Sequence, residues 1–452
     1  MVMNYFELVR NKKYPLYKIL LIFVLFYFLT FGIVMAYTAG QPDQSAHQYY
    51  SKEFSKTWGI PEEDMSAGHR IFTGRPYLYY WINGAIAKIY NWIFPNNPPI
   101  RIVMIWRIFS AVIGTFTVFY CYKTASKAAD NPYAGLLAAF FLSNTLMFVF
   151  VSGGNSYDNL MNLAAMAAIY HLVSVYKGHN FVKHTALTGT WVIIGSLSKE
   201  QYLLLTLIIF LAWLFYVIQN FRVIKIKLNK SNIAVGLVFI IFLGLFLGLY
   251  GVNLIRYSRT TPLCNQIKPQ EYCGTYLYRK NFYEPINLRV LWERRDTVLN
   301  PFQYASQYWI WKMAESIWGI LSHNTFVPLF SVGLHTLFAL WSFICLFRYW
   351  KPQDKVNTLL LLIIVSYCGY IFIWNYKLEL EYSFQHYGVT GRYLLPVLGI
   401  LLSLMVHNIL KIRSTLIKRL TIALSIVLYF NGGLWLYLSR YAEKFSHWHI
   451  YK

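Results

Sequence analysis

Charged residues are scarce in this chain, and acidic residues are the scarcest. Only 13% of its 452 residues are charged, against about 25% in a typical soluble protein. The acids number 18 against 41 Lys and Arg, while 57% of the residues are hydrophobic. Much of that hydrophobic share lies in uninterrupted runs that a soluble core does not need. The sequence therefore predicts an all-α polytopic membrane protein.

About eleven segments are apolar and long enough to cross a bilayer. The segment 77–94 is less apolar than these spans, because Asn83, Lys88 and Asn91 interrupt its aromatic residues. We expect that segment to lie on the membrane surface. The predicted spans are 16–37, 102–122, 134–151, 157–176, 184–198, 202–218, 233–254, 327–347, 358–375, 393–410 and 420–438.

The loops between these spans alternate in charge. With the N-terminus in the cytoplasm, the Lys-rich and Arg-rich loops fall on the cytoplasmic side, and fifteen of the eighteen acids fall outside. This distribution accounts for much of the net charge of +23 and needs no nucleic-acid partner. It predicts one integral membrane domain over residues 1–452, with two large exoplasmic loops at 38–101 and 255–326.

Several motifs are absent. The chain has no Walker loop, no G-x-G-x-x-G after a strand and no H-E-x-x-H, and it has no internal repeat of the kind found in many transporters. Of its five cysteines, Cys264 and Cys273 lie in the second exoplasmic loop. A disulfide between them requires an oxidising compartment, and their spacing alone leaves the pairing open.

Polar residues collect at the exoplasmic ends of the predicted spans, where they are costly unless paired or hydrated. Snorkelling to the interface explains Glu200, Arg256 and Arg259, whereas we expect a function for Asp43 and Arg392. The residues that we expect to share one outward-facing cavity are Asp43, Gln44, His47, Asn155, Asp158, Lys199, His386, Arg392 and Tyr393.

This set fits the transfer of a group from a phosphate to a hydroxyl. A carboxylate orients and deprotonates the hydroxyl, and a cation holds the phosphate that leaves. Asp43 and His47 are spaced i, i+4 and could share a metal ion. We favour a hydrogen bond between the acid and the imidazole instead, so we predict no metal, with a divalent ion as the alternative.

Two stretches resemble a known family. Pro42-Asp43-Gln44-Ser45-Ala46-His47 is similar to the Pro-Asp-Glu-x-x-His signature of a large bacterial membrane family that is grouped with the GT-C glycosyltransferases. Gly391-Arg392-Tyr393-Leu394-Leu395-Pro396 resembles its Gly-Arg-Tyr-x-x-Pro signature. More weakly, the Asn155–Asp158 and Arg75–Trp81 stretches resemble other GT-C motifs.

The resemblance implies a GT-C-like bundle and a polyprenyl-phosphate sugar donor. It implies that Asp43 is the catalytic carboxylate and that Arg392, with Lys199, binds the donor phosphate. Gln44, His47, Asp158 and Tyr393 are expected to position acceptor and donor. Gln44 stands where the family has Glu, and an amide can be neither a base nor a carboxylate ligand.

We therefore expect an inverting hexosyl or pentosyl transferase in a bacterial inner membrane. Its acceptor would be a cell-envelope glycan, lipid or protein. Two alternatives stay open: a flippase for lipid-linked glycans, and an O-antigen-type polymerase built around Arg294-Arg295.

Overall fold

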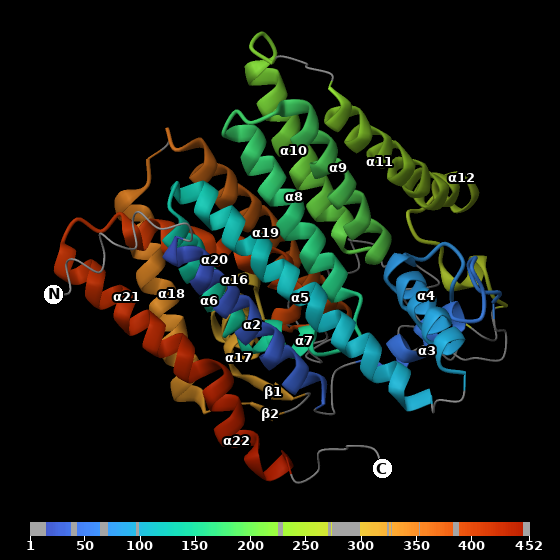
Figure 1. Cartoon of the computed structure of the whole chain (residues 1–452), viewed down its shortest axis with the longest axis horizontal. Coiled ribbons are helices and arrows are strands. Elements are labelled where there is room, and N and C mark those ends of the chain that lie inside the picture. Colours follow the sequence, from blue (N-terminus) through green and yellow to red (C-terminus); the bar gives the residue numbers. More distant parts are fainter. Residues whose placement is uncertain are drawn as a thin grey trace.

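The computed structural model describes residues 15–37, 43–63, 71–95, 99–224, 229–269, 273, 299–322, 325–326, 328–351, 353–382 and 388–445. Within these ranges the chain forms a bundle of helices (Figure 1). The strands in the described part are the antiparallel pair β1 (Ile320–Ser322) and β2 (Thr325–Phe326). The all-α fold class is thus confirmed. Pro42, His386 and parts of the 255–326 loop, including Arg294-Arg295, lie outside the described residues.

Nine helical stretches in the described ranges are long and apolar enough to cross a membrane, and the chain is an integral membrane protein. Three of these stretches continue through a π-helical or 3-10 turn. The stretches contain α2 (Leu16–Ala36), α5 (Pro99–Ala129), α8 (Asp158–Tyr176), α10 (Tyr202–Asn220), α11 (Lys230–Phe246) with η1 (Leu247–Gly251) and α12 (Val252–Tyr257), α18 (Leu329–Tyr349), α19 (Lys355–Tyr382), η5 (Gly391–Leu394) with α20 (Leu395–Leu410), and α21 (Thr415–Phe430) with η6 (Asn431–Trp435) and α22 (Leu436–Phe445).

Two of the eleven predicted spans differ from the prediction. The segment 134–151 is broken into α6 (Pro132–Ser143) and α7 (Leu146–Ser152), which are bent by 72°. Asn144 stabilises the break, because its Oδ1 accepts a hydrogen bond from the Tyr27 hydroxyl at 2.5 Å and its Nδ2 donates to the Phe140 carbonyl at 2.9 Å. The segment 184–198 lies in α9 (Phe181–Ser198), which is not apolar enough to count as a span because threonines and serines interrupt it.

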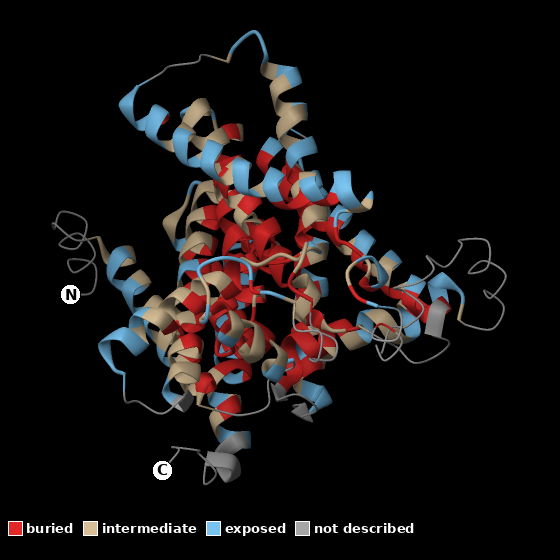
Figure 2. Ribbon diagram, turned by 90° about the vertical axis from the view of Figure 1, so that its right-hand side faces the viewer, coloured by how far each residue is buried: buried red, intermediate tan, exposed pale blue. Residues whose placement is uncertain are grey.

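Helix α8 is the centre of the bundle. Nearly all its side chains are buried, and it packs against α5, α9, α10 and α20. Figure 2 shows this buried core surrounded by more exposed helices. Small residues such as Ala164, Ala165 and Ala168 let the neighbouring helices approach closely. Asp158, the first residue of α8, is therefore held at a fixed place at one end of the core.

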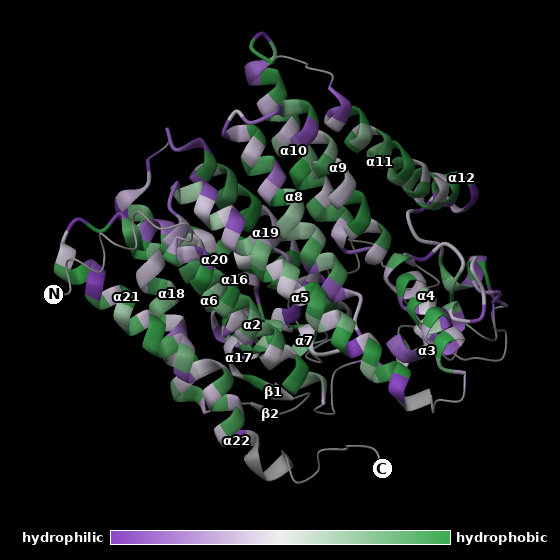
Figure 3. Ribbon diagram, viewed as in Figure 1, coloured by the Kyte–Doolittle hydropathy of each residue, from purple (hydrophilic) through white to green (hydrophobic). Residues whose placement is uncertain are grey.

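Helices α3 (Gln44–Phe54) and α4 (Leu78–Ile93) lie together at one end of the bundle (Figure 1). Helix α4 is not among the helices that could span, and Trp92 near its end is 84% exposed. Its other face buries Tyr79, Tyr80 and Asn83, so it is amphipathic (Figure 3). A Cβ at Gly84 would lie 2.5 Å from the Phe54 carbonyl oxygen, so this glycine lets α3 and α4 touch.

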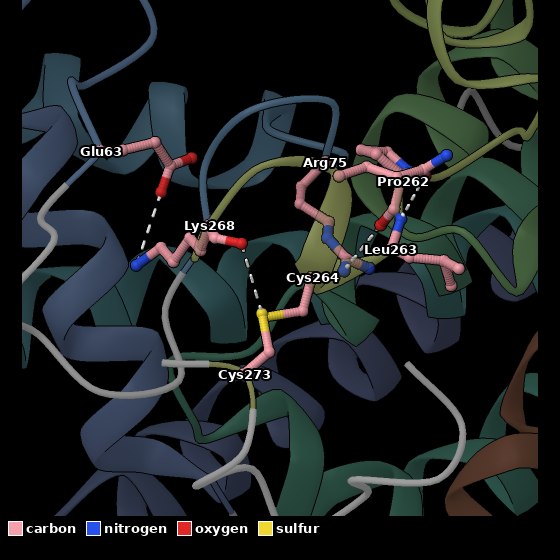
Figure 4. The surroundings of a disulfide bond; sticks show 8 residues. Glu63, Arg75, Pro262, Leu263, Cys264, Lys268 and Cys273 are labelled. Atoms are coloured by element: carbon pink, nitrogen blue, oxygen red, sulfur yellow. Dashed lines mark hydrogen bonds and ion pairs between the residues drawn. A yellow bond between two sulfur atoms is a disulfide. The ribbon is translucent and has the colours of Figure 1, made fainter. Parts of the chain in front are cut away.

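A disulfide joins Cys264 to Cys273, with the Cα atoms 5.7 Å apart, which settles the pairing that the sequence left open. Figure 4 shows Lys268, within the loop that the disulfide closes, reaching toward Glu63 of the first loop. The Lys268 Nζ to Glu63 Oε2 distance is 3.8 Å. Glu63 Oε1 also accepts hydrogen bonds from the amides of Phe72 and Thr73. The 38–101 and 255–326 loops are thus in contact beside α3 and α4.

The remaining described elements are short helices near the second loop and before α18. They are η2 (Cys264–Gln266), α16 (Pro301–Tyr304), η4 (Ala305–Trp309) and α17 (Ile310–Gly319). Helix α17 packs against α7 and η5, and through η5 it helps to position Arg392.

Candidate active site

Asp43 stands at the start of α3 with an unusual backbone. Its φ is 58°, in the left-handed region that few residues other than glycine adopt. Its side chain does not cap the helix. The carboxylate instead accepts a hydrogen bond from Arg392, with 2.9 Å between Oδ2 and Nη2. The fold therefore brings together the two residues, 349 positions apart, for which the sequence most strongly predicts a function.

Arg392 lies in η5, the 3-10 turn that precedes α20. The preceding Gly391 donates its amide to Ser316 Oγ of α17 at 2.6 Å. A Cβ at Gly391 would overlap Ile317, so a side chain there would push the turn away from α17. Gly391 thus permits the close contact that fixes Arg392. The Arg392 side chain is 17% exposed and that of Asp43 is 55% exposed.

Lys199 and Asp158 form a second ion pair behind the first. The distance from Lys199 Nζ to Asp158 Oδ1 is 2.6 Å, and the side chains are 4% and 2% exposed. Lys199 Nζ also lies 4.8 Å from the centre of the Tyr157 ring and 5.0 Å from that of Tyr393. Burial lowers the pKa of Lys199, but Asp158 together with Tyr157 and Tyr393 outweighs burial and leaves the pKa above its ordinary value.

His47 is buried on the inner face of α3. Its Nδ1 lies 2.7 Å from the Tyr80 hydroxyl, and its ring contacts Tyr157 at 4.7 Å between ring centres. The expected side-chain hydrogen bond with Asp43 is wrong, because the left-handed backbone turns the carboxylate toward Arg392. Burial, reinforced by the charges of Arg392 and Lys199, lowers the pKa of His47 to about 4. His47 is therefore neutral near pH 7.

A buried polar network holds α3, α4 and the start of α8 in place, and sequence reasoning missed it. Asn155 Oδ1 accepts hydrogen bonds from the Tyr79 hydroxyl and from Asn83 Nδ2, both at 2.8 Å. The Tyr79 hydroxyl also lies 2.8 Å from Ser110 Oγ of α5. Asn83 was a reason to place α4 on the surface, yet its side chain is fully buried. The i, i+4 spacing of Tyr79 and Asn83 was the available signal.

A cavity of about 420 Å³ opens between these elements. Asp43, His47 and Lys199 line it together with an aromatic wall of Tyr50, Phe54, Phe72, Tyr77, Tyr80 and Tyr157. Gln44 and Arg392 do not line the cavity, and each has a donor, Gln44 Nε2 and Arg392 Nε, that is buried without a hydrogen-bond partner among the described residues. The cavity thus combines two carboxylates, Asp43 and Glu200, with the cationic side chains of Lys199 and Arg75, which suit an oxygen-rich ligand. Asp158 and Tyr393 lie behind Lys199 and do not line the described cavity.

A second, mainly apolar cavity of about 700 Å³ adjoins the first. Phe72, Arg75 and Tyr77 line both. The second cavity lies between α4 and the exposed α11–η1–α12 span. A Cβ at Gly244 or Gly248 would meet no atom within 4 Å, so this wall is open. The pair of cavities gives a polar chamber with an apolar groove beside it; we call the second cavity the apolar groove.

The residues of the polar chamber do not fit a divalent metal. Within the described ranges no three His, Cys, Asp or Glu side chains gather in a group that could hold an ion. The carboxylates of Asp43 and Asp158 are each paired with a cation, and Gln44 offers only an amide oxygen as a ligand.

Comparison with known proteins agrees with this architecture. A family model described as dolichyl-phosphate-mannose-protein mannosyltransferase matches residues 75–246, and no curated protein matches the chain. The archaeal oligosaccharyltransferase AglB from Archaeoglobus fulgidus, solved with an inhibitory peptide and a dolichol-phosphate, superposes with a TM-score of 0.51 at 15% identity, over 93% of this chain and 55% of that one. The likeness therefore extends along nearly the whole chain, which spans about half the length of that enzyme.

Two further solved structures match less closely. The S. cerevisiae protein O-mannosyltransferase Pmt1-Pmt2 complex, bound to its sugar donor, gives a TM-score of 0.38 at 18% identity, over 55% of this chain and 35% of that one. ArnT from Cupriavidus metallidurans, bound to undecaprenyl phosphate, also gives 0.38, at 11% identity over 86% of this chain and 77% of that one.

Proposed function

We propose that this chain is a glycosyltransferase of the GT-C type, and that it transfers a sugar from a polyprenyl-phosphate donor to a hydroxyl group. The acceptor would be a cell-envelope glycan, lipid or protein on the exoplasmic side of a bacterial inner membrane. The observation that carries the proposal is the contact of Asp43 with Arg392, beside a polar chamber that adjoins an apolar groove. A base, a phosphate clamp and a place for a lipid tail are what this reaction requires.

Asp43 and a donor phosphate would compete for the guanidinium of Arg392. Its guanidinium binds planar oxyanions through paired N–H groups, and its Nε is a buried donor without a partner in the described part. A donor phosphate that took Arg392 would release the Asp43 carboxylate toward the polar chamber. The base would then be freed only when the donor is present.

The transfer itself is a single displacement. The Asp43 carboxylate takes the proton of the acceptor hydroxyl as that oxygen forms a bond to the anomeric carbon. The bond from that carbon to the phosphate oxygen breaks, and its electron pair leaves with the polyprenyl phosphate. Arg392 stabilises the charge of the leaving group. One displacement inverts the anomeric configuration.

The remaining residues of the polar chamber would position the two substrates. Neutral His47, fixed by Tyr80, and Gln44 offer hydrogen bonds to sugar hydroxyls. Lys199 adds positive potential from the chamber wall, and Tyr393 packs beside it.

The experiment that tests this proposal measures radiolabelled sugar transfer in membranes loaded with a panel of polyprenyl-phosphate sugars. Asp43→Asn keeps the shape of the side chain and removes the base. We expect transfer to fall by about 10²–10⁴-fold, the usual contribution of a general base. The matched control is Glu53→Gln, the same change on the same helix, where the acid pairs with Lys56 at 2.7 Å.

The control variant should transfer sugar at the wild-type rate, and both variants should unfold at the wild-type temperature. Full transfer by Asp43→Asn would remove Asp43 as the base. Failure of the well-folded wild-type protein with every donor would count against the enzyme itself.

The apolar groove supplies a second test, because the donor's lipid tail should lie there. Gly248→Trp fills the open wall of the apolar groove, whereas Gly236→Trp adds the same side chain elsewhere on the same span, also in open space. We expect Gly248→Trp to lower kcat/KM about ten-fold, or about 1.4 kcal/mol, for a long-chain donor and to spare a short-chain donor. If Gly248→Trp and Gly236→Trp lowered kcat/KM equally, the lipid tail would lie outside the apolar groove. The same would follow if Gly248→Trp affected the long-chain and short-chain donors equally.

A further inference from the structure

A cluster of basic side chains lies at the opposite end of the bundle from α3 and α4. It comprises Lys123 and Lys127 near the end of α5, His171 near the end of α8, and Lys183 and His184 at the start of α9. We call these five residues the basic cluster. In Figure 1, α5 starts close to α4 and ends at the far side of the bundle, so the basic cluster is well separated from the polar chamber. The charge pattern predicts that this end faces the cytoplasm.

The basic cluster is built around the ring of Tyr170. Lys123 Nζ and Lys127 Nζ lie 4.4 Å and 4.8 Å from the ring centre. The His171 ring lies 4.9 Å from Tyr170, and His171 Nδ1 is 2.8 Å from His184 Nδ1. The Lys127 ammonium also donates to Ser174 Oγ at 2.8 Å. Aromatic and hydroxyl contacts thus fix two ammonium groups in place, rather than leaving them as solvated loop charges.

The basic cluster has no acid of its own. The charged groups that act most strongly on His171 are His184, Lys123, Lys127 and Lys183, all basic. His184 is likewise surrounded by lysines and by His179. Asp130, an acid near the edge of the basic cluster, pairs with Lys177 at 2.6 Å and acts electrostatically on His179. Three lysines therefore converge without a carboxylate among the described residues that neutralises them.

Positive charges that converge in a partly desolvated place repel one another, and a bound anion relieves this repulsion. Ammonium groups, imidazole N–H groups and hydroxyls from three helices form a donor set for phosphate oxygens. The basic cluster lies where α5 and α8 end and α9 begins, and the charge pattern predicts that this end meets the lipid headgroups of the cytoplasmic leaflet. We propose that it is a second phosphate site, which binds the headgroup phosphate of an anionic membrane phospholipid.

The test measures lipid binding by the purified full-length protein in detergent, by native mass spectrometry, during titration with phosphatidylglycerol or phosphatidylcholine. We expect one phosphatidylglycerol to bind in preference to phosphatidylcholine. Lys123→Gln/Lys127→Gln should weaken that binding about thirty-fold, since each lysine near a headgroup contributes about a factor of five. Lys418→Gln/Arg419→Gln removes two charges on the same predicted face, outside the basic cluster, and should leave binding unchanged.

Two further variants separate binding from folding. Lys127→Arg keeps the charge and should retain the lipid. Lys123→Gln/Lys183→Gln spares the contact of Lys127 with Ser174. This variant should lose the bound lipid, while its thermal unfolding temperature stays at the wild-type value. Equal binding by wild type and both charge-loss variants would overturn the proposal, as would equal affinity for phosphatidylcholine. Displacement of the lipid by millimolar inorganic phosphate would show a site for soluble phosphate instead and would overturn the lipid assignment.

Discussion

Two ion pairs border the candidate active site, and they differ in nearly every physical respect. Asp43 and Arg392 meet at the edge of the polar chamber, with side chains 55% and 17% exposed. Asp158 and Lys199 meet in the core, with side chains 2% and 4% exposed. The first pair joins a left-handed residue to a 3-10 turn. The second joins the start of α8 to the residue that follows α9.

The difference separates a pair that can open from a pair that cannot. An exposed pair gains little from its contact, because water replaces either partner at small cost. A buried pair cannot lose one partner without leaving an unpaired charge in the core. Asp43 and Arg392 are therefore free to exchange partners during a reaction cycle. Asp158 already neutralises the charge of Lys199. The binding of a donor phosphate by Lys199 therefore stays a prediction, and we expect it to contribute less than Arg392.

Breaking the buried pair should have the largest effect. Lys199→Met leaves the Asp158 carboxylate buried and unpaired beside the Tyr157 ring. We expect the free energy of unfolding to fall by about 3–5 kcal/mol, with loss of sugar transfer through loss of structure. Thermal unfolding of the protein in detergent, followed by tryptophan fluorescence, measures the change.

The double variant Asp158→Asn/Lys199→Met provides the control, since it removes both charges. It should recover much of the stability that Lys199→Met loses, and the difference is the coupling between the two residues. Equal stability of wild type and Lys199→Met would show that the buried pair is not needed for the fold.

Breaking the Asp43–Arg392 pair, which we call the open pair, should change sugar transfer and not the stability of the fold. Arg392→Gln removes the phosphate clamp, and we expect kcat/KM for the donor to fall about 10²-fold, as for other preorganised donors to developing charge. Unfolding should shift by less than about 1 kcal/mol, because the pair is partly exposed. Steady-state kinetics and thermal unfolding of the same preparation test both halves of this prediction.

Arg392→Lys separates charge from geometry, because Lys keeps the charge and lacks the planar fork. We expect it to recover only part of the lost rate. A variant Arg392→Gln with wild-type kinetics would assign the donor phosphate to another cation. A large loss of stability in Arg392→Gln would mean that the Asp43–Arg392 pair is needed for the fold, as we expect for the Asp158–Lys199 pair.

The sequence predicted the fold class well and the partners within the site poorly. Apolar runs report directly on membrane helices, which is why nine of the eleven predicted spans are found in the described residues. The two that differ depend on local chemistry. Asn144 breaks one span through side-chain hydrogen bonds, and the polar residues of α9 lower the hydropathy of the other. The hydrogen bonds of Asn144 are not visible in a count of apolar residues, whereas the low hydropathy of 181–198 is.

Within the site, the spacing of Asp43 and His47 predicted a contact that backbone geometry prevents. A left-handed residue at position 43 directs its carboxylate away from the axis of α3, and no periodicity reveals that angle. The pairs Asp43–Arg392 and Asp158–Lys199 are separated by hundreds and tens of residues. The sequence placed all four at one membrane face. Only the packing of α8, α9 and η5 shows which of them pair.

A prediction with little effect at neutral pH uses His47, which feels the charges of all four residues. Its pKa in the folded protein is about 4, against about 6.5 in the unfolded chain. Between these values the unfolded chain binds a proton that the folded protein does not. Stability is therefore full above about pH 6.5 and is lost progressively as the pH falls toward 4. His47→Asn should flatten this part of the stability profile, and the difference from wild type isolates His47 from the other buried histidines.

Histidine-selective NMR then uses the same residue to compare the pairs. Arg392 lowers the pKa of His47 and Asp43 raises it, so Arg392→Gln should shift that pKa upward and Asp43→Asn should shift it downward. Opposite shifts from the two partners show that the open pair can be taken apart while the polar chamber stays folded. An unchanged pKa in both variants would mean that the pair lies too far from His47 in solution, which would contradict the arrangement of the candidate active site.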